Sequence, residues 1–187
     1  MSDDFRPIKF LPPEPDQALR AAFLGTTYGP VWHRFRLGTE LQSRPEEEHV
    51  EESGPDWAVG VRSWVIITAW NPRGQPQAEW DNAEAHQRLL ARVSRAGLVP
   101  ILALNGNGQW RETALILPGA SLRDGIRLGR EFAQAAVLYG IGRRGALVWL
   151  SIDRRKVDRG GVERRHGERC RVERYWVQDV DAANEQR

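Results

Sequence analysis

The sequence contains little sulfur, almost no lysine and no long apolar run. Cys170 is the single cysteine, so the chain has no intramolecular disulfide. The CxxC and HExxH patterns typical of zinc sites are absent, and we predict no metal and no cofactor. The longest apolar stretches, residues 64–70 and 98–104, are far shorter than the roughly 20 residues that a membrane helix needs. These absences argue against a disulfide scaffold and a helical membrane protein.

The general class follows from composition. The first fifteen residues lack the apolar segment of a secretory signal, so we expect a cytoplasmic protein without a membrane partner. Of the 187 residues, 41% are hydrophobic and 28% are charged, which is ordinary for globular proteins. The length favours one domain, which we place at residues 1–152, followed by an extension at 153–187. No pattern fixes the oligomeric state.

Charge is distributed unevenly along the chain. Residues 39–56 carry seven acidic residues and one arginine, whereas residues 154–174 carry nine basic residues and four acidic ones. A basic segment of this kind is typical of contact with nucleic-acid phosphates. Arginine provides 25 of the 27 basic residues, which suits bidentate phosphate contacts but would also follow from a GC-rich genome. The candidate nucleic-acid contacts in the tail are Arg154, Arg155, Lys156, Arg164 and Arg165. The alternative is a solvated tail.

Turn and capping signals divide the chain into elements. Asp16 is expected to cap a helix over residues 17–24, followed by a strand at 31–37 and an acidic loop at 39–56. In the core, 61–152, capping boxes at Asp81 and at Ser121 predict helices that end at Gly97 and Tyr139. Predicted core strands span 61–70, 98–104, 110–117 and 146–152. The Asn-Gly-rich residues 105–108 predict a hairpin between the second and third of these strands.

This order predicts an α+β fold with a ferredoxin-like βαββαβ core. The core would carry an N-terminal helix-strand extension and a basic C-terminal tail with one more strand near 172–177. Polar residues should gather at one rim of the sheet, where strands end and helices begin. They are Asn71, Arg73, Asn82, Asn105, Arg111, Glu112, Arg143 and Arg144. Helix N–H groups beside arginines predict a site for a small anionic ligand. The alternative is that these residues only form turns and caps.

Helix periodicity places Asn82 and His86 on the face of their helix that looks toward the core. A core-facing histidine is commonly a hydrogen-bonded structural group. The functional alternative is that His86 and Glu112 form an acid/base pair across the rim.

Several of these residues also carry a family resemblance. Residues 68–72 read TAWNP, Asn82 follows, residues 110–112 read WRE, and residues 128–134 read LGREFAQ. With Thr26 and Tyr28 upstream, this pattern resembles the bacterial family called domain of unknown function 3293 over residues 26–150. The resemblance implies no established activity. It singles out Tyr28, Asn71, Glu112 and Gln134 as candidate site residues.

Three function classes remain open. The first is a binding module for an anionic ligand or nucleic acid, formed by the rim alone or together with the tail. The second is a small enzyme with Glu112 as general acid/base and with Asn71, Asn82 and Gln134 orienting the substrate. The third is a protein-interaction domain that uses a sheet edge or the tail.

Overall fold

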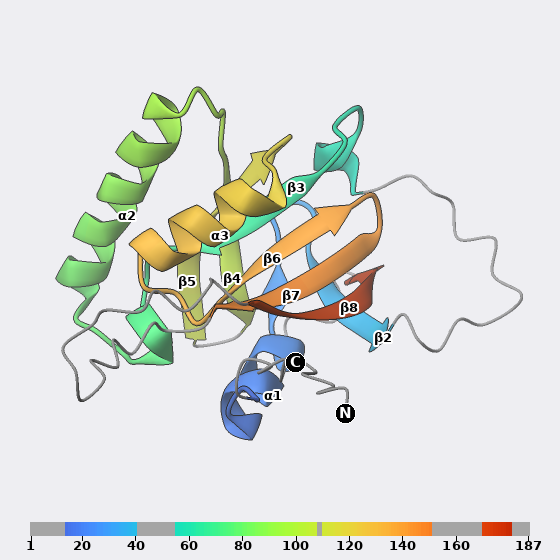
Figure 1. The fold of residues 1–187 in the computed structure, drawn as a ribbon, viewed down its shortest axis with the longest axis horizontal. Helices are drawn as coiled ribbons and strands as arrows, with labels where there is room; N and C mark the ends of the chain where they lie inside the picture. The colour runs from blue at the N-terminus through green and yellow to red at the C-terminus, as the bar shows by residue number, and fades with distance from the viewer. Residues whose placement is uncertain (1–13, 41–54, 108–109, 151–169, 181–187) are drawn as a thin grey trace, which may run out of the picture.

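One sheet and three helices make up the described part of the chain in the computed structural model, which covers residues 14–40, 55–107, 110–150 and 170–180 (Figure 1). The helices are α1 (Gln17–Gly25), α2 (Glu79–Arg95) and α3 (Leu122–Glu131), with short 3₁₀ turns η1 (Asp56–Ala58) and η2 (Pro72–Gly74). The strands are β1 (Thr27–Tyr28), β2 (Phe35–Glu40), β3 (Trp64–Thr68), β4 (Ile101–Asn107), β5 (Trp110–Pro118), β6 (Ala136–Ile141), β7 (Arg144–Leu150) and β8 (Cys170–Asp179).

The sheet is antiparallel throughout and curls into a nearly closed barrel. Its strand order is β1-β2-β8-β7-β6-β3-β5-β4, so β1 and β4 are the two edges. These edges approach each other, because Leu104 N donates to Gly29 O at 3.0 Å and Thr27 Oγ1 donates to Gly106 O at 2.9 Å. The contact covers part of the backbone that two free edges would otherwise expose.

Arg34 reinforces this seam from a buried position, with 9% of its surface exposed. Its guanidinium donates to Gly29 O and Gly106 O at 2.7 Å each, and also to Leu104 O. It further reaches the carbonyl and the hydroxyl of Thr27, at 3.1 and 2.7 Å. One planar donor fork therefore joins β1 to β4, which a lysine could not reproduce.

Side chains alternate between two cores along the strands. Trp64, Ile66 and Ile116 point into the barrel with the interior cluster. Val65 and Leu117 point outward, where α2 and α3 cover the sheet (Figure 1). The third helix, α1, lies at one end of the barrel, and its Phe23 packs edge-on against Trp149 with ring centroids 5.3 Å apart.

The close approach of α3 to the sheet explains its glycines. A Cβ at Gly129 would collide with Leu150 and Val137, and a Cβ at Gly125 would lie 3.1 Å from Val65 Cγ2. None of the helices in the described residues has the length and apolarity that crossing a membrane requires.

The predicted ferredoxin-like core is wrong. The sheet has eight strands, and the helix expected to reach Tyr139 ends at Glu131, while residues 136–141 form the additional strand β6. Ala133, with φ of 52°, stops the helix and turns the chain toward β6. The misreading has a physical cause: the apolar run around Val137 lacks polar alternation, and such a run fits a helix face as well as a buried strand.

Several local predictions are confirmed. Asp16 caps α1, Ser121 and Asp124 form a capping box on α3, and β4 and β5 pair as a hairpin. The extra strand near 172–177 is β8, which lies between β2 and β7 inside the sheet. The capping box at Asp81 is wrong, because α2 begins at Glu79 after Ala78 without a side-chain cap. The strand expected at 31–37 begins later, as β2 at Phe35. Most of the acidic loop lies outside the described residues.

Candidate functional site

We call the end of the sheet where β3 and β4 finish and β5 and β6 begin the rim. Asn71 follows β3 there in a left-handed conformation, with φ of 47°. Its backbone N–H donates to Asn82 Oδ1 at 2.9 Å, and Asn82 Nδ2 donates back to Asn71 Oδ1 at 3.1 Å. Gln77 N also donates to Asn71 Oδ1, at 3.0 Å. Because these bonds occupy the Asn71 oxygen, its amide nitrogen is fixed in the direction of Glu112.

Glu112 is buried at the start of β5, with 6% of its surface exposed. Asn71 Nδ2 donates to its Oε1 at 2.6 Å. Burial raises the pKa of Glu112 from 4.5 to about 7, and the hydrogen bond from Asn71 offsets only part of that rise. The carboxyl group is therefore poised to gain or lose a proton near neutral pH.

Asn105 faces Glu112 from the neighbouring strand. The two residues are register partners in the β4–β5 pair, and both follow the alternation that points Ala103 and Ala114 into the barrel. Asn105 is 8% exposed, and its Oδ1 is buried without a hydrogen-bond partner among the described residues. We call Asn71, Asn82, Asn105 and Glu112 the rim cluster.

Tyr28 lies on the interior side near the rim cluster. Its hydroxyl donates to Phe23 O at 2.6 Å and is buried. Burial raises the pKa of Tyr28 above its usual range, and the nearby charge of Glu112 adds to the effect. Tyr28 is therefore a neutral wall of the cluster and joins it to α1.

Gln134 fastens the start of β6 to the end of β3. Its Nε2 donates to Trp70 O at 3.1 Å and to Phe132 O at 3.3 Å. Next to it, Arg73 N donates to Ala133 O at 2.8 Å. In the described part of the chain, the non-glycine residues with positive φ are Asn71, Arg73 and Ala133. A backbone hydrogen bond connects the turn that holds Asn71 and Arg73 to Ala133. Backbone strain of this kind tends to gather at functional sites.

His86 lies one turn after Asn82 on α2 and is 7% exposed. Burial lowers its pKa, so it is neutral at neutral pH. Its Nδ1 and the indole Nε1 of Trp70 are buried without a partner among the described residues. None of the hydrogen bonds found there joins His86 to Glu112. His86 sits with the outer core covered by α2, whereas Glu112 points inward. A direct acid/base pair is therefore not formed in this structure.

The predicted arginines divide between the two ends of the sheet. Arg73 and Arg111 are exposed at the rim. Arg143 and Arg144 lie at the opposite end: Arg143 pairs with Asp179 at 2.8 Å and Arg144 stacks over Trp176. Their expected place at the rim is wrong, because β6 carries the chain back along β3 before the β6–β7 turn. The tail residues Arg154, Arg155, Lys156, Arg164 and Arg165 lie outside the described residues.

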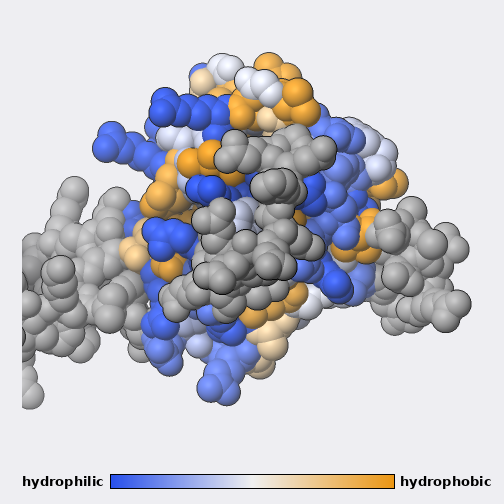
Figure 2. All heavy atoms as spheres, turned by 90° about the vertical axis from the view of Figure 1, so that its right-hand side faces the viewer, coloured by the Kyte–Doolittle hydropathy of each residue, from blue (hydrophilic) through white to orange (hydrophobic). Residues whose placement is uncertain are grey.

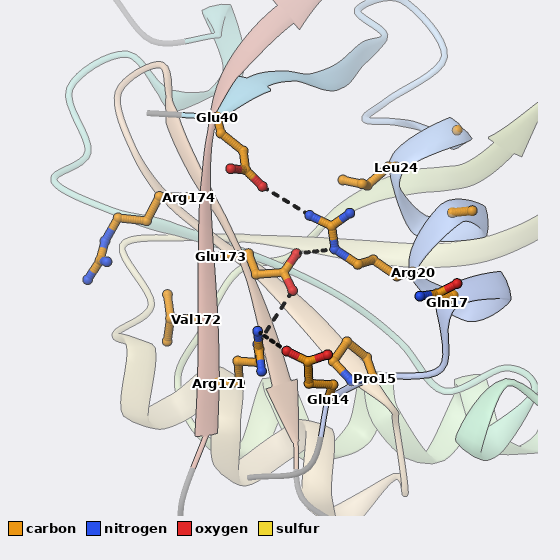
Figure 3. Close-up of a pocket in the computed structure, with 12 residues that line it drawn as sticks. Glu14, Pro15, Gln17, Arg20, Leu24, Glu40, Arg171, Val172, Glu173 and Arg174 are labelled. Carbon is orange, nitrogen blue, oxygen red and sulfur yellow. Dashed lines mark hydrogen bonds and ion pairs between the residues drawn. The ribbon is translucent and has the colours of Figure 1, made fainter. Parts of the chain in front are cut away.

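A second polar cluster lies in a groove between α1 and β8 (Figure 3). Arg20 donates to Glu173 at 2.8 Å, to Tyr175 at 2.9 Å and to Glu40 at 3.0 Å. The Tyr175 hydroxyl donates to Glu173 at 2.6 Å. We call these four residues the clasp. Burial raises the pKa of Glu173, but the bonds from Tyr175 and Arg20 outweigh it and leave that pKa below its usual range. The clasp leaves no signal in the sequence, because Arg20 and Glu173 are far apart in the chain and neither belongs to a local motif.

In the view of Figure 2, the described residues visible between the grey atoms are mostly hydrophilic, with hydrophobic groups at the top, at both sides and near the bottom. No group of three or more His, Cys, Asp or Glu side chains suited to a metal ion occurs among the described residues.

Comparison with known proteins gives a family match over part of the chain and no activity. The model of a family described as "Protein of unknown function (DUF3293)" matches residues 67–137. This confirms the resemblance seen in the sequence, over a shorter stretch than 26–150. The matched stretch contains Asn71, Asn82, Glu112 and Gln134, all of which lie at the rim. No curated protein and no solved structure matches the chain.

Proposed function

We propose that this chain binds a small polar molecule at the rim cluster and that Glu112 exchanges a proton with it as a general acid or base. The observation that carries the proposal is a buried carboxyl group held by a single amide hydrogen bond, with a pKa raised to about 7. A general acid or base works best when its pKa lies near the working pH.

The surroundings of Glu112 suit this role. Asn71 holds one carboxylate oxygen, and the described residues supply no donor to the other. Asn71 is itself fixed through Asn82 and the backbone of Gln77. The carboxyl group therefore has a defined orientation and one oxygen available to a bound molecule.

A purely structural role would be filled better by glutamine. A glutamine at position 112 could accept the same hydrogen bond from Asn71 Nδ2 without the cost of burying an ionisable group. Carrying a carboxyl group here lowers stability above neutral pH, which is the pattern expected when function constrains a residue.

The carboxyl group at the centre also weighs against an anionic ligand at the rim. An ionised Glu112 would repel a phosphate or carboxylate placed against it, and the exposed Arg73 and Arg111 have solvent to satisfy them. Nucleic-acid contact by the basic tail stays a prediction from the sequence.

The test is a screen for binding and conversion in D₂O. We would mix the full-length protein with a chemically mixed panel of small metabolites and follow binding by saturation-transfer NMR. Conversion, or deuterium incorporation from solvent, would be followed in the same samples. We expect at least one compound that wild type binds and converts, and that Glu112→Gln converts at least about a hundredfold more slowly.

The matched control is Glu84→Gln, which changes an exposed glutamate on α2. It should behave like wild type. The proposal would be rejected if Glu112→Gln converted the compound at the wild-type rate, or if no compound in the panel depended on the rim cluster.

A further inference from the structure

Two acceptors at the rim cluster have no donor among the described residues. One is Oε2 of Glu112, since its single hydrogen bond goes to Oε1. The other is Oδ1 of Asn105, which is buried and unpartnered. An unpaired buried acceptor such as Asn105 Oδ1 costs on the order of 1–3 kcal/mol, so this atom calls for a partner outside the described side chains.

The two acceptors are placed to act together. Asn105 and Glu112 are register partners on adjacent antiparallel strands and point to the same face. Directly opposed side chains in such a pair have Cβ atoms about 4.5–5.5 Å apart. One small group can therefore reach both.

The amide donors nearby are already engaged. Asn71 Nδ2 donates to Glu112, and Asn82 Nδ2 donates to Asn71 Oδ1 and to Gln77 O. Tyr28 directs its hydroxyl to Phe23 O. A bound ligand can supply the donors that these side chains do not.

We propose that the ligand carries a planar nitrogen head group of the guanidinium or amidinium class, which donates one N–H to Glu112 Oε2 and another to Asn105 Oδ1. A planar fork of N–H donors matches two acceptors side by side better than a single ammonium group does. This inference rests on the proposed function, since it names the chemical class bound at the same site.

A cationic head group couples binding to ionisation of Glu112. Only the ionised carboxylate pairs with the cation, so binding below the pKa of Glu112 must release a proton. Affinity should therefore rise about tenfold for each pH unit up to that pKa and level off above it.

The test uses methylguanidinium as the probe on the full-length protein, with binding measured by NMR titration across this pH range. Tetramethylammonium carries the same charge without N–H donors and serves as the ligand control. We expect methylguanidinium binding to weaken at least about tenfold in Glu112→Gln and also to weaken in Asn105→Ala. Asn107→Ala, which changes an exposed residue on the same strand, should bind like wild type.

The possible failures separate the two proposals. Equal binding of tetramethylammonium, or unchanged binding in Asn105→Ala, would overturn the head-group assignment. The head-group assignment would also be overturned if the panel compounds whose binding or conversion depends on Glu112 carried no N–H donors. The proposed function would still stand in that case. If neither methylguanidinium nor any panel compound depends on Glu112, both proposals fail.

Discussion

Glu112 and Glu173 are two largely buried glutamates in opposite electrostatic surroundings. Glu173 receives a guanidinium and a phenol hydroxyl, and its pKa lies below the usual range. Glu112 receives one amide, and its pKa rises to about 7. The same side chain therefore stabilises the fold in one place and strains it in the other.

The difference separates a cluster whose polar groups satisfy one another from the cluster that we propose binds a ligand. In the clasp, Arg20 donates to both partner carboxylates, and Arg171 outside it adds an ion pair to Glu173 at 3.8 Å. At the rim cluster, a carboxylate oxygen and an amide oxygen lack donors among the described residues. A satisfied polar network holds elements together, whereas an unsatisfied one is available for a ligand.

The largest expected effect comes from Glu112→Gln. Unfolded, Glu112 titrates near 4.5, and folded it titrates near 7, so folding takes up a proton between these values. Wild type should lose stability as pH rises through this window and reach its full penalty above pH 7. The shift corresponds to about 3 kcal/mol. The free energy of unfolding of Glu112→Gln, relative to that of wild type, should therefore increase by up to about 3 kcal/mol between about pH 4 and about pH 8. Urea unfolding at each pH measures it.

Glu84→Gln is the control for this comparison, because Glu84 is exposed beside Arg88. Its difference from wild type should stay within about 0.5 kcal/mol at each pH. A pH-independent difference for Glu112→Gln would mean that the Glu112 carboxyl group is not shifted.

The stabilisation that the clasp provides should depend on pH in the opposite sense to the effect of Glu112. Arg20→Met removes the donor to Glu173 and should lower the free energy of unfolding by about 2 kcal/mol at neutral pH. Because the folded pKa of Glu173 is depressed, this contribution is present above the unfolded pKa and is lost as pH falls through the folded pKa. Urea unfolding of Arg20→Met, Glu173→Gln and the double variant measures their coupling energy. Arg88→Met breaks an exposed pair and should cost at most about 0.5 kcal/mol.

Asn71→Gly tests the single bond that supports Glu112. Glycine relieves the positive φ of Asn71 but removes its three side-chain hydrogen bonds, so we expect a net loss between about 1 and 2 kcal/mol. The pKa of Glu112, measured by carboxyl ¹³C NMR, should rise further, because the donor that lowers it is gone. An unchanged pKa would show that Asn71 does not govern this carboxyl group.

The sequence predicted the core of the rim cluster because its elements are set by local signals. The Asn-Gly turn paired β4 with β5, and the directions of β3, β4 and β5 brought the ends carrying Asn71, Asn105 and Glu112 together. The family pattern added Tyr28 and Gln134, whose partners no local pattern reveals. Asn82 was expected to face the core from its helix phase, and it is buried.

The rest could not be predicted because it depends on contacts distant in the chain. The strand β6 is an apolar run, and its pairing with β3 and β7 decides its conformation. Because the prediction did not contain this strand, it placed Arg143 and Arg144 at the wrong end of the sheet. Arg34 closes the barrel against Gly106, and Arg20 binds Glu173 across most of the chain. Such long-range pairs leave no periodic trace in a single sequence.

The smallest expected effect comes from Tyr175→Phe, which removes one donor from Glu173 and leaves Arg20 in place. We expect a loss of about 1 kcal/mol in urea unfolding at neutral pH, because the partly exposed guanidinium still neutralises the carboxylate. The pKa of Glu173, followed by carboxyl ¹³C NMR, should rise toward its usual value and stay below that of Glu112. If the loss matched that of Arg20→Met, the phenol hydroxyl would stabilise Glu173 as much as the guanidinium does, and the ion pair would not be the dominant contact of the clasp.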